Sequence, residues 1–348
     1  MDTGRAANGT VASETPSVPD AWQHPCVVPT PSAPTAPGDG RAFGDLVAPY
    51  RRELHLYCYR MLGSLTDADD VLQDVLLAAW RGLDGFAGRS SLRTWLYSIA
   101  TRRCLNAVRG RGRRARHELV PPFRPPEPSR RGDVPWLQPY PDAELARDDG
   151  PAELHERRET VSLAALAALQ RLPPRQTAAL VLCDVLGFPV ADAAGMLDVT
   201  PTAAKGLLQR ARAASAPAVT GGAGSATELR WAARFAEAYT RDDVDGLVAL
   251  LTDDAWLAMP PAPHEYVGRD AVAGFLRASR DGRAGRRFLL VPTRANGQPA
   301  WGCFLDRPGA APTPVGIVVV TVDDSGIRGV TRFLDPALVD RFGVAGPR

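Results

Sequence analysis

Hydrophobic residues recur at helical spacing in three consecutive segments of the first third of the chain. The first segment runs from about residue 43 to Gly63, the second begins near Thr66, and the third extends from about Ser91 to Arg109. The Thr66 hydroxyl can cap the second segment, and the acidic residues that follow suit the positive end of a helix dipole. The pattern predicts an all-α domain over residues 41–116.

The second of these helices predicts two different faces. At 100° per residue, its apolar side chains collect on one face: Val71, Leu72, Val75, Leu76 and Ala79. The opposite face carries Asp70, Gln73, Asp74, Leu77 and Arg81. We therefore expect an exposed acidic stripe that contains a leucine.

Proline-rich sequence follows between residues 117 and 158 and predicts a linker. Within this linker, Trp136, Leu137 and Tyr140 supply two aromatic rings and a leucine. Large apolar groups in a linker usually dock on another surface. We expect these three residues to make an interdomain contact.

Helical periodicity resumes at about residue 159 and continues to Ala214, followed by a break rich in Gly, Ala and Ser at 215–227. The rest of the chain predicts three helices, at about 228–241, 244–251 and 269–280, and four strands, near 286–293, 299–305, 315–322 and 327–334. The dipeptide Asn296-Gly297 and the tripeptide 324–326 lie between successive strands, as in hairpins. Residues 228–345 are therefore predicted to form an α+β domain with an antiparallel sheet.

Composition excludes several classes of protein. The chain of 348 residues predicts two or three domains, and its 41 Lys+Arg against 39 Asp+Glu leave a net charge of only +2. No segment approaches the ~18 to 20 apolar residues of a membrane span, and the start lacks the features of a signal peptide, so we expect a cytoplasmic protein. Residues 1–40, rich in Pro, Ala, Thr, Ser and Gly, predict a disordered tail. The five cysteines form no Cys-x-x-Cys pair, and we expect no metal and no cofactor.

Positive charge is concentrated in one segment. Between Asp84 and Glu118 the chain has nine arginines and no acidic residue, and Phe86, Trp95 and Tyr97 lie among them. A ring can stack on an unpaired base at ~1 to 3 kcal/mol. The segment predicts contact with single-stranded or opened DNA, although Trp95 could instead belong to the core. The candidate residues are Arg89, Arg93, Trp95, Arg102 and Arg103.

Residues 189–212 predict a helix-turn-helix. Asp198 and Val199 make the turn, Thr200 can cap the second helix, and Pro201 suits its first position. The outward side chains of that helix are donors to phosphates and base edges with no acid among them: Thr202, Lys205, Gln209, Arg210 and Arg212. The pattern favours a helix that enters the major groove, although short helix pairs also occur in proteins that do not bind DNA.

Three segments together resemble regions 2 and 4 of an extracytoplasmic-function (ECF) sigma factor of the sigma-70 family. They are 66–80 (TDADDVLQDVLLAAW), 86–103 (FAGRSSLRTWLYSIATRR) and 172–212 (LPPRQTAALVLCDVLGFPVADAAGMLDVTPTAAKGLLQRAR). The final third resembles the SnoaL-like (NTF2-like) extension that some groups of these factors carry, through 295–300 (ANGQPA) and 333–336 (FLDP). The resemblance covers residues 43–342.

The resemblance implies a promoter-specificity subunit of RNA polymerase with two all-α sigma domains and a cone-shaped α+β domain that regulates it. Core polymerase would be bound through its β′ clamp helices and β subunit, with Asp70, Gln73, Asp74 and Leu77 on the β′ side. The 86–103 segment would capture the displaced strand of the −10 element, and the helix from Thr202 to Arg212 would read the −35 element. Ala204 and Gly206 depart from the family's pattern in that helix, so individual base contacts do not transfer.

A second hypothesis concerns the C-terminal third. Trp256, Met259, His264, Tyr266 and Trp301 are candidates to line a pocket, and folds of this cone shape also host isomerases and cyclases. The chain would then be a DNA-binding fusion whose last domain is an enzyme or a small-molecule receptor. His264 is the only histidine after residue 228 and has no assured acidic partner in the sequence. We therefore expect no catalytic residue, and a small ligand in this domain stays open.

Overall fold

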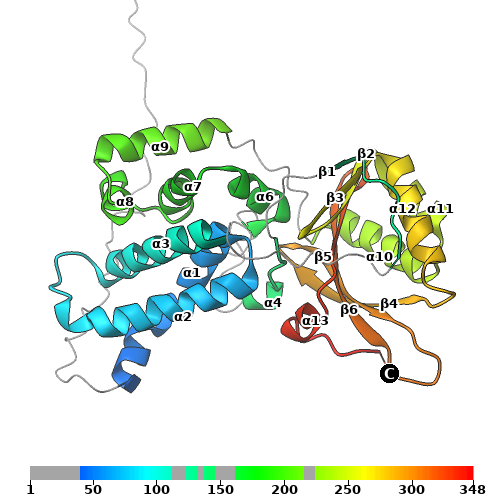
Figure 1. The fold of residues 1–348 in the computed structure, drawn as a ribbon, viewed down its shortest axis with the longest axis horizontal. Coiled ribbons are helices and arrows are strands. Elements are labelled where there is room, and N and C mark those ends of the chain that lie inside the picture. Colours follow the sequence, from blue (N-terminus) through cyan, green and yellow to red (C-terminus); the bar gives the residue numbers. More distant parts are fainter. Residues whose placement is uncertain (1–39, 112–122, 132–136, 146–160, 215–223, 348) are drawn as a thin grey trace, which may run out of the picture. The chain divides into compact units, whose positions relative to one another are not determined.

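The computed structural model describes residues 40–111, 123–131, 137–145, 161–214 and 224–347 (Figure 1). The chain divides into a unit of residues 1–46 and a unit of residues 47–348. The described part of the smaller unit is the beginning of the first helix. The expected tail up to residue 39 and the candidate contact residue Trp136 lie outside the described residues.

The first three helices follow the hydrophobic pattern closely. They are α1 (Gly40–Leu62), α2 (Leu65–Gly82) and α3 (Leu92–Arg111), with a 3-10 turn, η2 (Leu83–Gly85), after α2. All five residues of the expected apolar face of α2 are buried. The expected cap at Thr66 is wrong, because the Ser64 hydroxyl accepts from the Asp67 backbone N–H at 3.1 Å and α2 begins one residue earlier.

A second helical group contains the predicted helix-turn-helix. Its elements are α4 (Asp142–Leu145), α6 (Leu163–Arg171), α7 (Pro174–Leu180), a π-helical turn η3 (Val181–Val185), α8 (Val190–Leu197) and α9 (Pro201–Ala214). Asp198 takes the left-handed conformation that ends α8, with φ of 54°. The Thr200 hydroxyl accepts from the Ala203 N–H at 3.2 Å, so the predicted turn and cap are confirmed.

The C-terminal part is an α+β domain. Its helices are α10 (Ala226–Thr240), α11 (Val244–Ala249), α12 (Arg269–Asp281) and α13 (Ala337–Arg341). Its strands are β2 (Leu251–Met259), β3 (Ala262–Val267), β4 (Phe288–Ala295), β5 (Gln298–Leu305), β6 (Thr313–Asp323) and β7 (Gly326–Phe333). A two-residue strand from the proline-rich segment, β1 (Arg130–Arg131), pairs with β3 and completes the sheet order β1-β3-β2-β7-β6-β5-β4.

The sheet differs from the expectation in two respects. The sequence predicted neither β2 nor β3, because prolines crowd residues 260–263, at the turn between the two strands and the start of β3. The sheet is also not wholly antiparallel, since β2 and β7 pair in parallel. This pairing places β2, which follows the first two helices of the domain, beside its last strand, β7.

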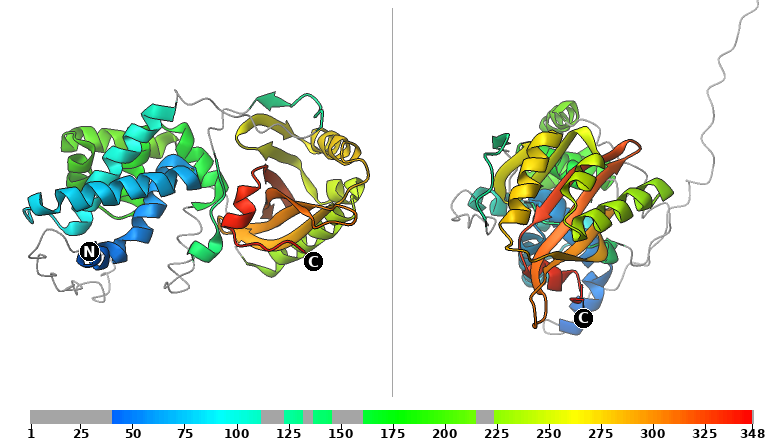
Figure 2. Two further views of the ribbon diagram at one scale, coloured as in Figure 1. Left: turned by 60° about the horizontal axis from the view of Figure 1, so that its bottom comes forward. Right: turned by 90° about the vertical axis from the view of Figure 1, so that its right-hand side faces the viewer.

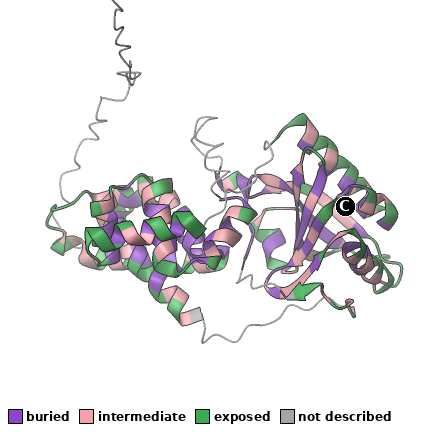
Figure 3. Ribbon diagram, turned by 90° about the horizontal axis from the view of Figure 1, so that it is seen from above, coloured by how far each residue is buried: buried purple, intermediate pink, exposed green. Residues whose placement is uncertain are grey.

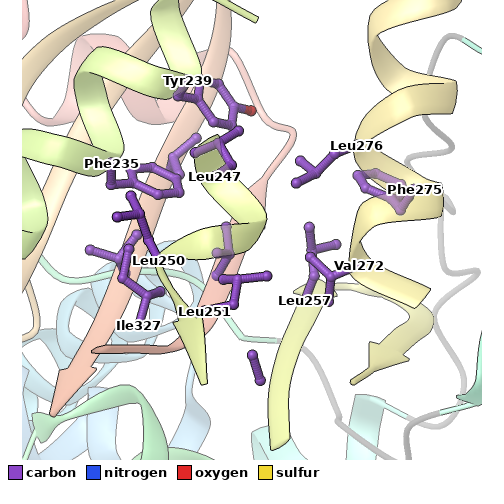
Figure 4. Packing of buried hydrophobic residues seen from close by; sticks show 14 of the residues in the cluster. Phe235, Tyr239, Leu247, Leu250, Leu251, Leu257, Val272, Phe275, Leu276 and Ile327 are labelled. Atoms are coloured by element: carbon purple, nitrogen blue, oxygen red, sulfur yellow. The ribbon is translucent and has the colours of Figure 1, made fainter. Parts of the chain in front are cut away.

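Helices α10, α11 and α12 cover one face of the curved sheet (Figures 1 and 2). The main core lies between this face and the helices, where Phe235, Tyr239 and Leu247 pack near Leu257 and Phe275 (Figure 4). Figure 3 shows the same division, with buried strands beneath helices whose outer sides are exposed. The helix-covered face is therefore the interior of the domain.

The expected pocket lining is wrong for one of its members. Met259, Tyr266 and Trp301 belong to the core cluster. Trp256 lies opposite Gly329 on the other face of the sheet, where a Cβ on Gly329 would meet the Trp256 ring at 2.4 Å. Because successive strand residues alternate between faces, Trp256 cannot share a surface with Leu257 and Met259.

Candidate functional site

The acidic stripe of α2 is exposed. We call it the α2 acidic face, and it comprises Asp70, Gln73, Asp74 and Leu77. Leu77 exposes 47% of its surface, and Trp80 on the next turn exposes 36%. Trp80 was not among the residues expected on this face, although its spacing of three residues from Leu77 places it on the same side of the helix. The face thus combines two carboxylates with two large apolar side chains.

Asp69 differs from its neighbours on α2 because it points back into the protein. Its carboxylate lies 3.0 Å from His55 Nε2 and 3.5 Å from Arg341 Nη2. Burial raises the pKa of Asp69, but the nearby imidazole of His55 and the charge of Arg341 outweigh it, so its pKa is lowered. Asp70 and Asp74 have no such ion pair among the residues that the structure describes, and their charges face outward.

The aromatic residues of the arginine-rich segment form a small cluster. The Trp95 ring is half-buried, with its centroid 5.0 Å from that of Phe86 at an angle of 36°. Gly82, at the end of α2, lies under this ring, since a Cβ there would meet it at 3.3 Å. Packing therefore fixes the orientation of Trp95 while leaving part of the ring accessible.

The four candidate arginines divide into two kinds. Arg89, Arg102 and Arg103 are exposed. Arg93 instead donates from Nε and Nη2 to the two carboxylate oxygens of Glu53, both at 2.9 Å, and lies over the ring of Phe188 at 4.3 Å. Burial lowers the pKa of Arg93, but the hydrogen bonds and charge of Glu53 outweigh it, so its pKa is raised. In this arrangement Arg93 is engaged within the protein.

Helix α9 presents the expected donors to solvent. Thr202, Lys205, Gln209 and Arg210 are exposed, whereas the inward positions Ala204, Leu208 and Ala211 are buried. Arg212 is exposed as well, but its guanidinium donates to both carboxylate oxygens of Asp184, at 2.8 and 2.6 Å. The helix is anchored by its small apolar face and keeps a basic outer face.

Two of the three predicted contact residues of the linker lie within the described residues, and both are packed. Leu137 and Tyr140 are buried. The Tyr140 hydroxyl is hydrogen-bonded to His55 Nδ1 of α1 at 2.9 Å, and the Tyr59 hydroxyl donates to the Gln138 carbonyl at 2.7 Å. Burial raises the pKa of Tyr140, so its hydroxyl stays protonated at neutral pH. The segment after Trp136 is thus held against α1.

Asn296 joins the same segment to the C-terminal domain. Its backbone N–H donates to the Tyr140 carbonyl at 2.9 Å, and its Oδ1 accepts from the Tyr140 N–H at 2.8 Å. Its Nδ2 donates to the Tyr59 hydroxyl at 2.9 Å and to the Val161 carbonyl at 2.6 Å. We call Tyr59, Tyr140, Val161 and Asn296 the Asn296 junction. One side chain therefore connects α1, the linker and the segment before α6 to the β4–β5 turn.

The residue after Asn296 strengthens the junction. The Gly297 N–H donates to Asp142 Oδ1 at 2.8 Å, and Arg294 Nε donates to Asp142 Oδ2 at 3.4 Å. The Asn-Gly turn lies where the sequence predicted it, but its role as a junction was not predicted. The signal in the sequence was the segment ANGQPA itself. A hairpin turn needs only residues that tolerate positive φ, so the turn alone does not require the buried amide of Asn296.

No group of three or more His, Cys, Asp or Glu side chains that could hold a metal ion occurs among the described residues. Within the same ranges, no helix is long and apolar enough to cross a membrane.

Two helical modules, one with an exposed acidic face and one with a helix-turn-helix, and an α+β domain define a sigma-70 type of transcription factor with a C-terminal extension. Comparison with known families agrees: Sigma-70 region 2 matches residues 46–114, Sigma-70 region 4 matches 162–214, and the SnoaL-like domain matches 232–329.

Individual relatives define the family further. The chain is 39% identical to the ECF RNA polymerase sigma factor SigG of Mycobacterium tuberculosis, over 88% of this chain and 86% of SigG. It is 34% identical to SigM of the same organism, over 51% of this chain and 76% of SigM. The chain therefore belongs to the ECF RNA polymerase sigma factors and carries a SnoaL-like C-terminal domain. The crystal structure of SigJ from M. tuberculosis has the same fold, with a TM-score of 0.54 at 22% identity, covering 85% of this chain and 98% of SigJ.

Proposed function

We propose that this chain directs RNA polymerase to specific promoters and that its C-terminal domain modulates this activity without being an enzyme. The α2 acidic face binds the β′ clamp helices of core polymerase, the 86–103 segment captures the opened −10 element, and α9 reads the −35 element. The observation that carries the proposal is that α2 and α9 each bury an apolar face and still expose a second, chemically distinct face. Such a protein acts where the polymerase is, in the cytoplasm.

The proposed domains are residues 41–116 for region 2, 159–214 for region 4 and 228–345 for the modulator, with segments 117–158 and 215–227 between them. The contacts of Tyr140 with His55 and with Asn296 support a modulating role for the last domain. A domain that grips the segment between the two DNA-binding modules biases their arrangement, and core polymerase or a ligand can shift that equilibrium.

Reconstitution with core polymerase tests the proposal. The full-length chain should form a stable holoenzyme that gives promoter-dependent run-off transcripts, and sequencing the 5′ ends of these transcripts would identify the promoter. A chain that does not associate with core, but whose fragment 228–348 turns over a small molecule, would support the DNA-binding fusion instead.

Substitutions on the two DNA-facing surfaces should have different effects. Arg102→Ala and Arg103→Ala should weaken open-complex formation on all promoters and reduce its salt dependence by about one phosphate contact each. Lys205→Ala and Gln209→Ala should change discrimination among −35 sequences by ~1 to 3 kcal/mol per lost base contact. Binding titrations at several salt concentrations on matched and mismatched promoters distinguish the two effects.

Arg175→Ala, at an exposed arginine at the start of α7, serves as the control. It should leave unchanged both the salt dependence of open-complex formation and the discrimination among −35 sequences. Equal losses on every −35 sequence would assign Lys205 and Gln209 to the DNA backbone. An unchanged salt slope would remove Arg102 and Arg103 from the interface.

A further inference from the structure

A buried arginine inside the C-terminal domain has no acidic partner among the described residues. Arg332, at the penultimate position of β7, exposes only 4% of its surface. It pairs with Val318 on β6, which in turn pairs with Trp301 on β5. Paired residues on neighbouring strands point to the same face, so Arg332 points toward the helix-covered interior. Its Nε has no hydrogen-bond partner, and its guanidinium forms no ion pair, among the residues that the structure describes.

A second buried arginine nearby has a hydrogen-bond partner for each of its three guanidinium nitrogens. Arg283, with 7% of its surface exposed, pairs with the Asp242 carboxylate. It also donates from Nη1 to the Ser279 hydroxyl and from Nε to the Arg286 carbonyl, both at 3.1 Å. Asp242 therefore balances Arg283, and the positive charge of Arg332 is left over. An uncompensated buried charge is unfavourable, so this arrangement calls for an anion.

Aromatic side chains surround the guanidinium. The Arg332 Cζ lies 5.2 Å from the Phe288 ring centroid and 5.7 Å from that of Phe275. Tyr239 stacks on the same Phe288 ring, with centroids 5.4 Å apart. Figure 4 shows Tyr239 on α10 and Phe275 on α12, on the two sides of the core cluster. Aromatic rings and the Tyr239 hydroxyl therefore lie around Arg332, and Arg283, whose Cζ lies 4.2 Å from the same Phe288 ring centroid, adds a second positive charge nearby.

That hydroxyl is a second donor without a partner. Tyr239 Oη is buried and has no hydrogen bond among the described residues. Burial raises the pKa of Tyr239 to about 12, although the charge of Arg332 acts in the opposite direction, so the phenol stays protonated at neutral pH. A guanidinium and a phenol beside one aromatic ring offer N–H and O–H groups to the same acceptor.

We propose that Arg332 and Tyr239 bind the carboxylate of a small organic acid with an apolar body, inside the C-terminal domain. A carboxylate carries the single negative charge that balances Arg332, and its two oxygens match the guanidinium fork. A phosphate dianion would leave an excess negative charge among aromatic rings, and a neutral ligand would leave Arg332 unbalanced. The regulatory meaning of this site rests on the modulating role proposed above, whereas binding itself does not depend on it.

Benzoate is a suitable probe, with benzamide as its uncharged analogue of the same shape and inorganic phosphate as the alternative anion. Benzoate at up to about 10 mM should raise the Tm of the free full-length chain in a saturable manner and change its tryptophan fluorescence, whereas benzamide and phosphate should do neither. Because this measurement uses neither polymerase nor DNA, its failure leaves the sigma-factor function untouched, and a failed transcription assay leaves this result standing.

Variants locate the site. Arg332→Met keeps the length and apolar contacts of the side chain and should weaken benzoate binding at least about tenfold, without lowering the Tm of the free chain. Tyr239→Phe removes a single oxygen and should weaken binding to a smaller extent. Arg328→Met, on the same strand but at a half-exposed arginine that pairs with Asp254 at 2.9 Å, should bind benzoate like the wild type.

Three results would overturn the proposal. They are no saturable effect of benzoate on the wild type, an equal effect of benzamide, or equal benzoate binding by wild type, Arg332→Met and Tyr239→Phe. If Arg332→Met does not fold, Tyr239→Phe and Arg328→Met still decide between a site at this position and binding elsewhere.

Discussion

Reversing the charge of both Asp70 and Asp74 to arginine is expected to abolish binding of core polymerase, with a loss of affinity of at least about 100-fold. Both carboxylates are exposed on α2, on the helix face opposite the buried core residues. Truncating one partner of an interfacial charge pair commonly costs ~2 to 5 kcal/mol, and two reversals add repulsion to that loss. Competition with the wild type for core polymerase measures the effect.

The fold should survive this substitution, because neither side chain contributes to the interior. Circular dichroism and the Tm of the double variant should stay close to those of the wild type. Asp270→Arg combined with Asp324→Arg makes the same change in net charge at exposed positions of the C-terminal domain and should leave core binding intact. A double variant of α2 that still competes with wild-type affinity would show that polymerase binds another face.

Leu77→Ala tests the apolar part of the same face. Leu77 is exposed, so its removal costs the free chain little stability, whereas an anchor buried in an interface typically costs more than about 1 kcal/mol. Reduced core affinity with an unchanged Tm would show that the exposed leucine is a binding residue.

Most of the helical fold could be predicted from the sequence because amphipathic helices repeat their pattern locally. The apolar face of α2 and the turn at Asp198 depend on residues within a few positions of one another. Strand β3 could not be predicted, because it is short and proline-rich at its start, and its pairing with β1 joins residues far apart in the chain. The parallel pairing of β2 with β7 is likewise a property of the whole domain.

The same contrast between local patterns and long-range contacts applies to the candidate sites. Exposure of the α2 acidic face and of the α9 donors could be predicted, since each lies opposite an apolar face on the same helix. The pairing of Arg93 with Glu53 could not, because the two residues are 40 positions apart. The contact of Asn296 with Tyr59 spans 237 positions. A run of arginines therefore indicates a basic surface but does not reveal which members are already paired within the protein.

The Asn296 junction should couple the C-terminal domain to transcription. Asn296→Gly should loosen the C-terminal domain from the rest of the chain and change transcription in the same direction as deletion of residues 228–348. Glycine tolerates the φ of 57° at this position, so the β4–β5 turn is preserved and only the amide is lost. That amide makes three buried hydrogen bonds, to Tyr140 N–H, the Tyr59 hydroxyl and the Val161 carbonyl.

Asn296→Gly should weaken the attachment of the C-terminal domain to the rest of the chain by about 3 kcal/mol. Each buried hydrogen bond contributes roughly 1 kcal/mol, and the partners left unsatisfied add to the cost. Limited proteolysis of the proline-rich segment should become faster, and run-off transcription should change in rate but not in promoter choice. Asp324→Gly, in the exposed β6–β7 turn, is the matched control and should alter neither the proteolysis rate nor the rate of run-off transcription. If Asn296→Gly leaves both the proteolysis rate and transcription at wild-type values, the junction does not transmit the influence of the C-terminal domain, and a modulating role must depend on other contacts.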